Sequence, residues 1–229
     1  MPVITFANPK GGSGKTTAAL LLACELAKRD ADVVIIDADP ERWISRWGKE
    51  PGRPERLEII NTATEENIMD VLREAAQRAH FVIVDPEGSA NQLVSFAIGD
   101  SDLVIIPMQG NAMDAKGGAK AIKAIRQTEQ HIRRSIPFSV LLTRTAAAVQ
   151  SRSARSVEAE LEDHGIDVFE TSLIERAAFR ELTSYGGTLD TLDPKEVNNI
   201  DKAKANARAF AMEVIAKLRK MSPAQGKVA

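Results

Sequence analysis

The stretch from residue 3 to residue 29 constrains the fold of this chain more than any other part. A short apolar run at residues 3–6 leads into a glycine-rich segment at residues 10–17, and apolar side chains then recur at helical spacing through residues 16–29. A strand, a glycine-rich turn and a helix in this order form a phosphate-binding loop, because glycines let backbone N–H groups converge on an anion at a helix N-terminus. We therefore expect an α/β fold with a mostly parallel sheet.

The loop sequence assigns roles to two side chains. In Gly14-Lys15-Thr16, the lysine is expected to reach the β- and γ-phosphates of a nucleotide, and the threonine hydroxyl to bind Mg2+. The general pattern has a glycine where this chain has Pro9, and Lys10 adds a second lysine. The nucleotide-binding residues that the loop predicts are Lys10, Gly11, Gly12, Ser13, Gly14, Lys15, Thr16 and Thr17.

Pro9 followed by Lys10 resembles the deviant phosphate loop, or deviant Walker A motif, of the ParA/MinD family of ATPases. The resemblance covers nearly the whole chain and is nearest to the short ParA-type ATPases that partition plasmids or chromosomes. It implies a P-loop NTPase architecture with helices on both faces of the sheet. It also implies that Lys10 reaches across an ATP-sandwich homodimer to the partner's phosphates and acts with Lys15 in catalysis.

Acidic residues end two further apolar runs. Asp37 and Asp39 lie near the end of the run at residues 33–40, and Asp85 follows the run that begins at residue 81. Continuous apolar runs are typical of strands buried on both faces of a parallel sheet, and the carboxyl ends of such strands meet at one rim. We therefore expect the three carboxylates beside the phosphate loop, where Mg2+ needs oxygen ligands.

The resemblance also implies a role for each acid. Asp39 is expected to position or activate the attacking water, and Asp37 and Asp85 are expected at the metal together with Thr16. The family often has Thr-Pro-Pro after its third motif, whereas this chain has Pro-Glu-Gly at residues 86–88. No role is therefore assigned to this short segment.

The rest of the chain alternates apolar runs with helical patterns, which predicts a parallel sheet covered on both faces. Further strands are expected at residues 57–60, 102–107, 138–145 and 168–174, and further helices at residues 65–79, 115–134, 151–164 and 201–221. The strand ending near Thr143 lacks the acid that reads guanine in guanine-specific relatives, which favours ATP. The family often has asparagine at this position, so the adenine contacts stay open.

Composition limits the other possibilities. The 229 residues, 44% of them hydrophobic, suit one ATPase domain at residues 1–221, followed by a polar tail at 222–229 that is expected to be disordered. A net charge of −2 excludes a positive electrostatic field over the whole molecule that would attract nucleic acid. A single cysteine, Cys24, excludes an internal disulfide. No apolar run approaches the ~18 residues of a membrane span, so we expect a cytoplasmic protein without membrane contact.

The resemblance implies a Mg2+-dependent ATPase that segregates plasmids or chromosomes. It would bind DNA non-specifically as an ATP dimer, associate with the nucleoid in that state, and be stimulated by a ParB-like or small adaptor protein. Because the chain starts at the phosphate-loop strand, we expect no N-terminal DNA-binding domain. DNA contact then needs a local basic face, for which the candidates are Arg176, Arg180, Lys204, Arg208, Lys217 and Arg219.

Other readings stay open to different degrees. A related ATPase could position another cargo, such as a conjugation, secretion or chemotaxis complex, because the adaptor is encoded elsewhere. A MinD-like membrane-cycling ATPase needs a C-terminal amphipathic anchor, which the polar end of the chain does not provide. A nitrogenase-iron-protein-like reductase needs paired cysteines, and this chain has only Cys24. Trp43 and Trp47, spaced i,i+4, either pack on the domain or contact a partner.

Overall fold

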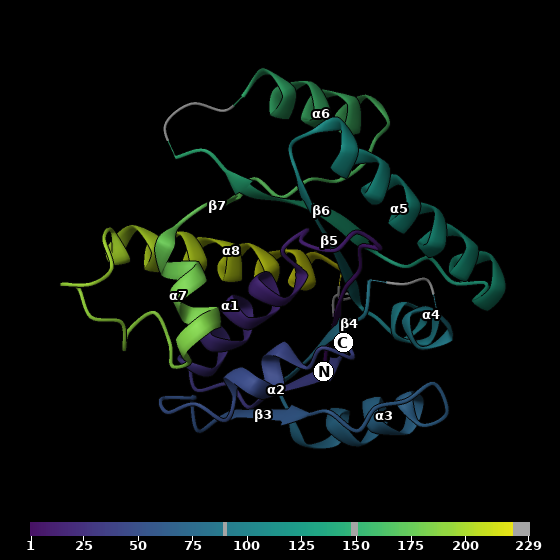
Figure 1. The fold of residues 1–229 in the computed structure, drawn as a ribbon. Coiled ribbons are helices and arrows are strands. Elements are labelled where there is room, and N and C mark those ends of the chain that lie inside the picture. Colours follow the sequence, from purple (N-terminus) through teal and green to yellow (C-terminus); the bar gives the residue numbers. More distant parts are fainter. Residues whose placement is uncertain (89–90, 148–150, 222–229) are drawn as a thin grey trace, which may run out of the picture.

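The computed structural model describes residues 1–88, 91–147 and 151–221, so the predicted tail at 222–229 lies outside the described residues. Its centre is a seven-stranded sheet in the order β3-β2-β4-β1-β5-β6-β7, in which neighbouring strands pair in parallel (Figure 1). The strands are β1 (Val3–Phe6), β2 (Val33–Ala38), β3 (Leu57–Ile60), β4 (Phe81–Pro86), β5 (Leu103–Gln109), β6 (Phe138–Thr145) and β7 (Leu173–Ile174). The predicted fold class is confirmed.

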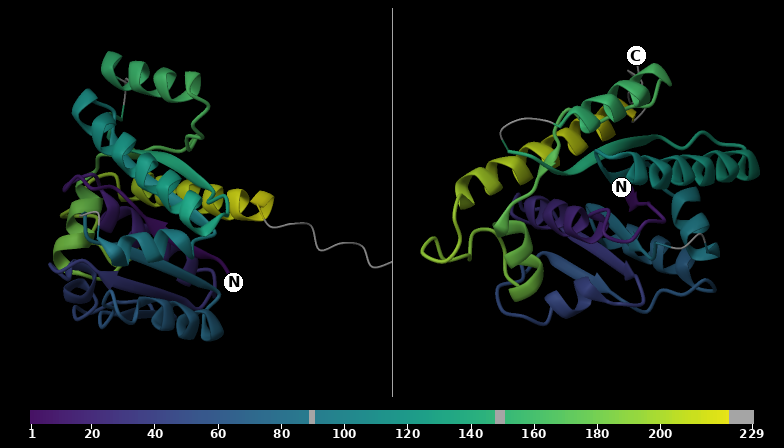
Figure 2. Two further views of the ribbon diagram at one scale, coloured as in Figure 1. Left: turned by 90° about the vertical axis from the view of Figure 1, so that its right-hand side faces the viewer. Right: turned by 45° about the horizontal axis from the view of Figure 1, so that its top comes forward.

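Helices cover both faces of this sheet (Figures 1 and 2). Four of them, α1 (Lys15–Ala27), α2 (Trp43–Trp47), α7 (Ala177–Tyr185) and α8 (Ile200–Met221), pack into one apolar cluster. The other face carries α3 (Ile68–Arg78), α4 (Gln92–Gly99), α5 (Ala112–Ile132) and α6 (Arg152–Asp163). Strand residues alternate between the two layers: Val33 and Ile35 of β2 join the first cluster, whereas Val34 and Ile36 join the second face.

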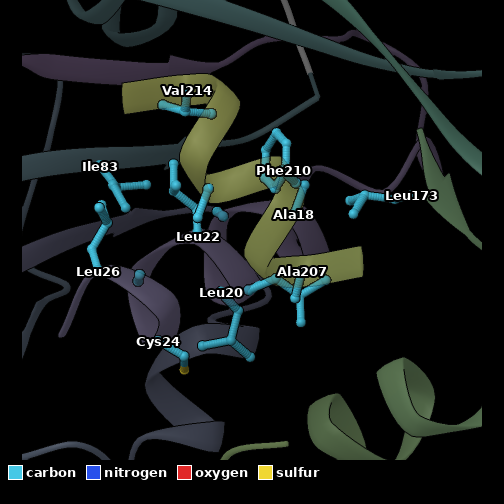
Figure 3. Packing of buried hydrophobic residues seen from close by; sticks show 14 of the residues in the cluster. Ala18, Leu20, Leu22, Cys24, Leu26, Ile83, Leu173, Ala207, Phe210 and Val214 are labelled. Atoms are coloured by element: carbon cyan, nitrogen blue, oxygen red, sulfur yellow. The ribbon is translucent and has the colours of Figure 1, made fainter. Parts of the chain in front are cut away.

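The helix that follows the phosphate loop is held in the centre of the first layer. Nearly every residue of α1 is buried, because the sheet lies on one side of it and α8 on the other, with Phe210 and Val214 of α8 packed into the same cluster (Figure 3). Cys24 belongs to this core, and burial, helped by the charge of Glu25, raises the pKa of its thiol to about 12. Packing along the whole length of α1 therefore holds the N-terminal end of this helix in place beside the phosphate loop.

Several predicted boundaries were wrong for identifiable reasons. The helix expected at 115–134 begins at Ala112, because Asn111 caps it by accepting a hydrogen bond from the backbone N–H of Asp114 at 3.0 Å. The strand expected at 168–174 is reduced to β7 and a single bridge at Val168. Between them, Glu213 of α8 accepts the N–H groups of residues 170 and 171, which removes these donors from the sheet. Both α4 and α7 were missed as helices.

The two tryptophans have different environments. Trp47 is buried in the first cluster, whereas Trp43 is 52% exposed and carries the Arg46 guanidinium 5.0 Å from its ring centre. Packing therefore explains Trp47 but not Trp43.

Candidate nucleotide-binding site

The phosphate loop connects the central strand β1 to α1 at the carboxyl edge of the sheet. Gly12 and Gly14 adopt φ angles of 74° and 95°, in the left-handed region where glycine is favoured. Gly14 is the N-cap of α1 and has no side chain with which to cap the helix. The first N–H groups of α1, from Lys15 onward, are therefore available to an anion.

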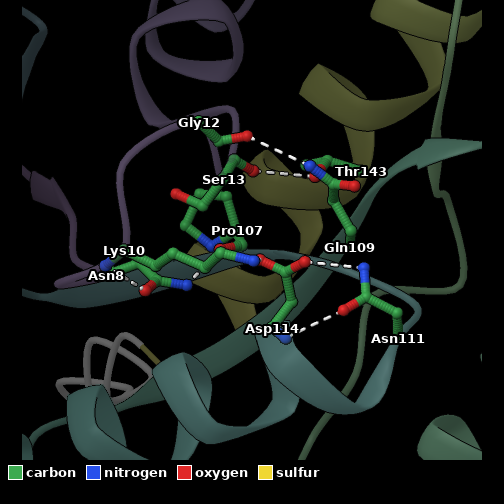
Figure 4. Close-up of polar contacts among 9 residues, drawn as sticks. All are labelled: Asn8, Lys10, Gly12, Ser13, Pro107, Gln109, Asn111, Asp114 and Thr143. Carbon is green, nitrogen blue, oxygen red and sulfur yellow. Dashed lines mark hydrogen bonds and ion pairs between the residues drawn. The ribbon is translucent and has the colours of Figure 1, made fainter.

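Side chains of β5 and β6 contact the carbonyl oxygens of the loop (Figure 4). The Thr143 hydroxyl donates to the Ser13 carbonyl at 2.7 Å, and the Gln109 amide donates to the Gly12 carbonyl at 3.2 Å. These contacts hold the carbonyl oxygens of Ser13 and Gly12 in place. Thr143, which departs from the asparagine frequent in the family, thus has a structural role in anchoring the loop.

Lys15 and two of the predicted acids are buried beside this loop. Lys15 is 7% exposed, Asp85 is 1% exposed and Asp37 is fully buried. Asp37 of β2 and Asp85 of β4 are register partners on adjacent strands. The loop after β4 also lies close, since a Cβ added to Gly88 would sit 3.4 Å from the Lys15 ammonium. The structure thus places Asp37, Asp85 and Lys15 at the same edge of the sheet.

The buried acids have unsatisfied oxygens. Neither oxygen of Asp85 has a hydrogen bond of regular geometry within the described residues, and the same holds for Oδ1 of Asp37. The second oxygen of Asp37 accepts from the Ser45 N–H at 2.8 Å and from its hydroxyl at 2.5 Å. Sequence reasoning missed Ser45. Unpaired buried carboxylate oxygens point to a ligand that they would meet when the site is filled.

Burial raises the pKa of Asp85 to about 7. The nearby Thr16 hydroxyl and the Lys15 ammonium lower this pKa, and the charges of Asp37 and Asp39 raise it. A divalent cation here would favour the ionised carboxylate.

The donor set fits Mg2+ held mainly by a substrate. Among the described residues, no three acidic, histidine or cysteine side chains gather closely enough to hold a metal ion alone. Mg2+ commonly takes one or two protein oxygens and completes its shell with water and phosphate. The Thr16 hydroxyl and Asp85, with Asp37 beside it, could supply that limited contribution.

Asp39 lies at the end of β2 in an ordered turn. Its Oδ1 accepts the N–H of Glu41 at 2.9 Å, and its carbonyl accepts the N–H of Arg42 at 3.0 Å. The Arg42 guanidinium donates to the carbonyl of Asp37, which joins this turn to the strand. The carboxylate of Asp39 is half-buried and fixed in direction.

Lys10 points along the surface of its own chain. Its ammonium lies 2.8 Å from Oδ1 of Asp114 in the first turn of α5, a residue to which sequence reasoning gave no role. Burial of an acidic side chain is the feature that singles out Asp114, and burial cannot be seen in the sequence.

A cavity of about 200 Å³ opens beside the loop between β6, β7 and α7. Apolar side chains of Leu173, Ile174 and Phe179 line it together with polar groups. Its position next to Gly14 and Thr17 suits a base attached to phosphates on the loop.

The structure disperses the six basic residues predicted to bind DNA. Arg176 and Arg180 line the cavity beside the loop. Lys204 is 2.9 Å from Asp190, and Lys217 is 2.6 Å from Asp167 and lies over the ring of Phe169. Only Arg208 and Arg219 of the six are exposed on α8 without an ion pair among the described residues. No helix within the described ranges is long and apolar enough to cross a bilayer.

Comparison with known proteins gives consistent similarities. A family model described as "VirC1 protein" matches residues 1–222. A protein named ParA from Rhizobium radiobacter is 37% identical over 218 residues, which is 95% of this chain and 98% of the relative. A carboxysome distribution protein A from Halothiobacillus neapolitanus is 24% identical over 188 residues, covering 80% and 84% of the two chains.

The fold is also similar to a solved structure. The ATP complex of a Cyanothece McdA variant superimposes with a TM-score of 0.73 at 16% identity, covering 93% of this chain and 96% of that one.

Proposed function

Because this chain belongs to the VirC1 protein family and is a homologue of ParA-type ATPases, we propose that it is a Mg2+-dependent ATPase that forms an ATP-sandwich dimer and segregates or positions DNA. The relationship bears out the resemblance to short ParA-type proteins drawn from the loop sequence. The observation that carries the proposal is the set of unpaired buried oxygens on Asp85 and Asp37 beside Lys15.

In this proposal each residue of the site has a separate task. The loop N–H groups and Lys15 bind the phosphates, and the Thr16 hydroxyl and Asp85 hold the metal. When bound, Mg2+ neutralises phosphate charge and aligns the phosphates for in-line attack. Asp39, fixed by the N–H of Glu41, orients the water, and Lys10 of the partner copy stabilises the charge that develops on the phosphate.

We expect the purified chain to release phosphate from ATP in Mg2+ and to lose this activity on chelation of the metal with EDTA. The reason is that Asp85, Asp37 and Thr16 leave most of the metal's coordination shell to the nucleotide. Neither Mg2+ nor ATP should therefore bind productively without the other. A phosphate-release assay with ATP and GTP in parallel is the measurement, and ATP should be preferred. Turnover that persists unchanged in EDTA would exclude a metal-dependent site.

The proposed DNA contact involves one of two basic faces. At about 100° per residue, Lys204, Arg208 and Arg219 fall on one side of α8, and Lys217 on another. On α5, Lys116, Lys120 and Lys123 follow the i, i+4, i+7 spacing of a single face and are exposed. No ion pair engages these three lysines within the described residues, which supports α5 as the second candidate.

We expect ATP-dependent retention on random-sequence DNA that weakens with salt, and about a tenfold loss of affinity on Arg208→Glu if α8 is the face. Lys120→Glu is the matched test of α5, and Arg53→Glu, exposed in the loop before β3, is the control for a charge reversal elsewhere. Retention that is equal with and without nucleotide would contradict a DNA face built by the dimer.

The family relationship restricts the cargo of this protein less than it restricts the reaction that the protein catalyses. Relatives named for chromosome partitioning and for carboxysome distribution are similar to this chain in sequence, so a large cargo other than DNA is the second candidate. A non-specific DNA contact would serve as the track in either case.

A further inference from the structure

Asp114 is a buried carboxylate whose charge is compensated by the phosphate-loop lysine Lys10. It lies in the first turn of α5 with 1% of its side chain exposed, and the Lys10 ammonium is 2.8 Å from its Oδ1 (Figure 4). Oδ1 has no hydrogen bond of regular geometry within the described residues. The ion pair is therefore the interaction that offsets the burial of this charge.

The surroundings hold Asp114 rigidly. The Asn111 side-chain amide donates to its Oδ2 at 2.7 Å, and Oδ1 of Asn111 accepts the backbone N–H of Asp114 at 3.0 Å. The first turn of α5 is thus locked around the carboxylate. The Lys10 side chain, at 35% exposed and with four rotatable methylenes, is the partner that can move.

The loop is shaped to receive the lysine in this position. Asn8 accepts the Lys10 N–H at 2.9 Å and donates to the Pro107 carbonyl at 2.7 Å, which fixes the backbone from which the lysine projects. Gly117 of α5 leaves room for the lysine stem, because a Cβ there would lie 3.2 Å from Lys10 Cβ and 3.0 Å from the Asn8 Oδ1. The contact is therefore a built resting place for Lys10.

We propose that Asp114 is a positioning residue that holds Lys10 in cis in the single chain and thereby opposes formation of the ATP dimer. The inference rests on the proposed function, in which Lys10 acts on the partner's phosphates. A buried carboxylate that loses its cation is left uncompensated, so Lys10 leaves Asp114 only when phosphate charge attracts it more strongly. Two such pairs break for each dimer, one in each copy.

Asp114→Asn should release Lys10, because an amide keeps the shape and the contact to Asn111 but no longer attracts an ammonium. Gly117→Ala is a second variant that crowds the lysine stem and leaves the charge of Asp114 in place. Asp190→Asn is the matched control, since it removes one carboxylate from an ion-paired group with Lys28 and Lys204 away from the loop.

The first measurement is the rate at which an amine-reactive ester labels Lys10 in the nucleotide-free protein, followed by peptide mass spectrometry. Lys116, exposed on the same helix, is the internal reference. Labelling of Lys10 relative to Lys116 should rise several-fold in Asp114→Asn and in Gly117→Ala, and stay unchanged in Asp190→Asn. An unchanged ratio in Asp114→Asn would overturn the inference whatever ATP does.

The second measurement is the dimer dissociation constant in saturating Mg-ATP, taken by sedimentation in the Asp39→Ala background. Adding Asp114→Asn should tighten the dimer by about tenfold or more, because the competent position of Lys10 is no longer the minor state. In Lys10→Ala/Asp39→Ala, which is expected to be monomeric, adding Asp114→Asn should not restore the dimer. A weaker or equal dimer in Asp39→Ala/Asp114→Asn would contradict the inference.

The two measurements separate the two proposals. If Asp39→Ala stays monomeric in ATP while labelling of Lys10 rises in Asp114→Asn, the cis contact holds and the sandwich dimer fails. If Asp39→Ala dimerises and Asp114→Asn alters neither readout, the dimer holds and the role of Asp114 fails.

Discussion

Replacing Lys15 with alanine is expected to abolish measurable ATP binding. Lys15 is 7% exposed and lies close to Gly88 in the loop after β4, and its ammonium lowers the pKa of Asp85, so it is placed to meet the phosphates that the loop binds. Truncating one member of a buried charge pair costs about 2–5 kcal/mol, which is roughly 30-fold to several thousand-fold in affinity. Titration calorimetry with Mg-ATP is the measurement.

The control for this substitution is Lys28→Ala, just past the end of the same helix α1. Lys28 pairs with Asp190 on the surface, so its loss should leave ATP affinity unchanged. A circular dichroism melt of Lys15→Ala should first establish that the variant is folded. Wild-type affinity in folded Lys15→Ala would refute the assignment of the loop.

Replacing Asp39 with alanine is expected to separate binding from hydrolysis. Asp39 is outside the loop and its carboxylate is fixed by the Glu41 N–H, so phosphate binding should persist. Loss of a positioned group that orients or activates water slows turnover by about 100-fold to 10,000-fold. A phosphate-release assay at saturating ATP is the measurement.

Glu41→Ala is the matched control for Asp39→Ala. Glu41 contacts Asp39 through its backbone N–H, so removing the exposed side chain of Glu41 leaves that contact in place. Turnover should then stay close to wild type. Equal turnover in Asp39→Ala and wild type would remove Asp39 from the proposed mechanism.

Local sequence patterns predicted the features that lie next to one another along the chain. The loop at residues 10–17 follows from a strand, glycines with positive φ and a helix start, each readable within a few residues. The placement of Asp37 beside Asp85 followed from a general property of parallel sheets, whose strand ends meet at one edge. These parts needed no knowledge of tertiary contacts.

Features that depend on contacts between distant segments could not be predicted in this way. The pair of Lys10 with Asp114 forms because β1 and β5 are neighbours, which brings the start of α5 to the loop. Lys204 and Lys217 read as free basic residues on one helix, yet each meets an acid from another segment. Thr143 read as a departure from a family pattern and is instead an anchor for Ser13.

The same limit explains the reduced strand near the C-terminus. The apolar residues at 168–174 predicted a full strand, but two backbone N–H groups in the middle of this segment donate to Glu213 of α8. A carboxylate from a helix thus replaces the sheet as acceptor. Such a competition is decided by packing of α8 and is invisible to a local pattern.

The central claim is that two copies of this chain enclose the nucleotide between them. Sedimentation velocity of purified Asp39→Ala, with and without saturating Mg-ATP, tests it most directly, because slow hydrolysis lets the bound state accumulate. We predict a monomer without nucleotide and a dimer with ATP, reverting to monomer in Lys10→Ala/Asp39→Ala. A variant that binds ATP in calorimetry and stays monomeric at all protein concentrations would contradict the account.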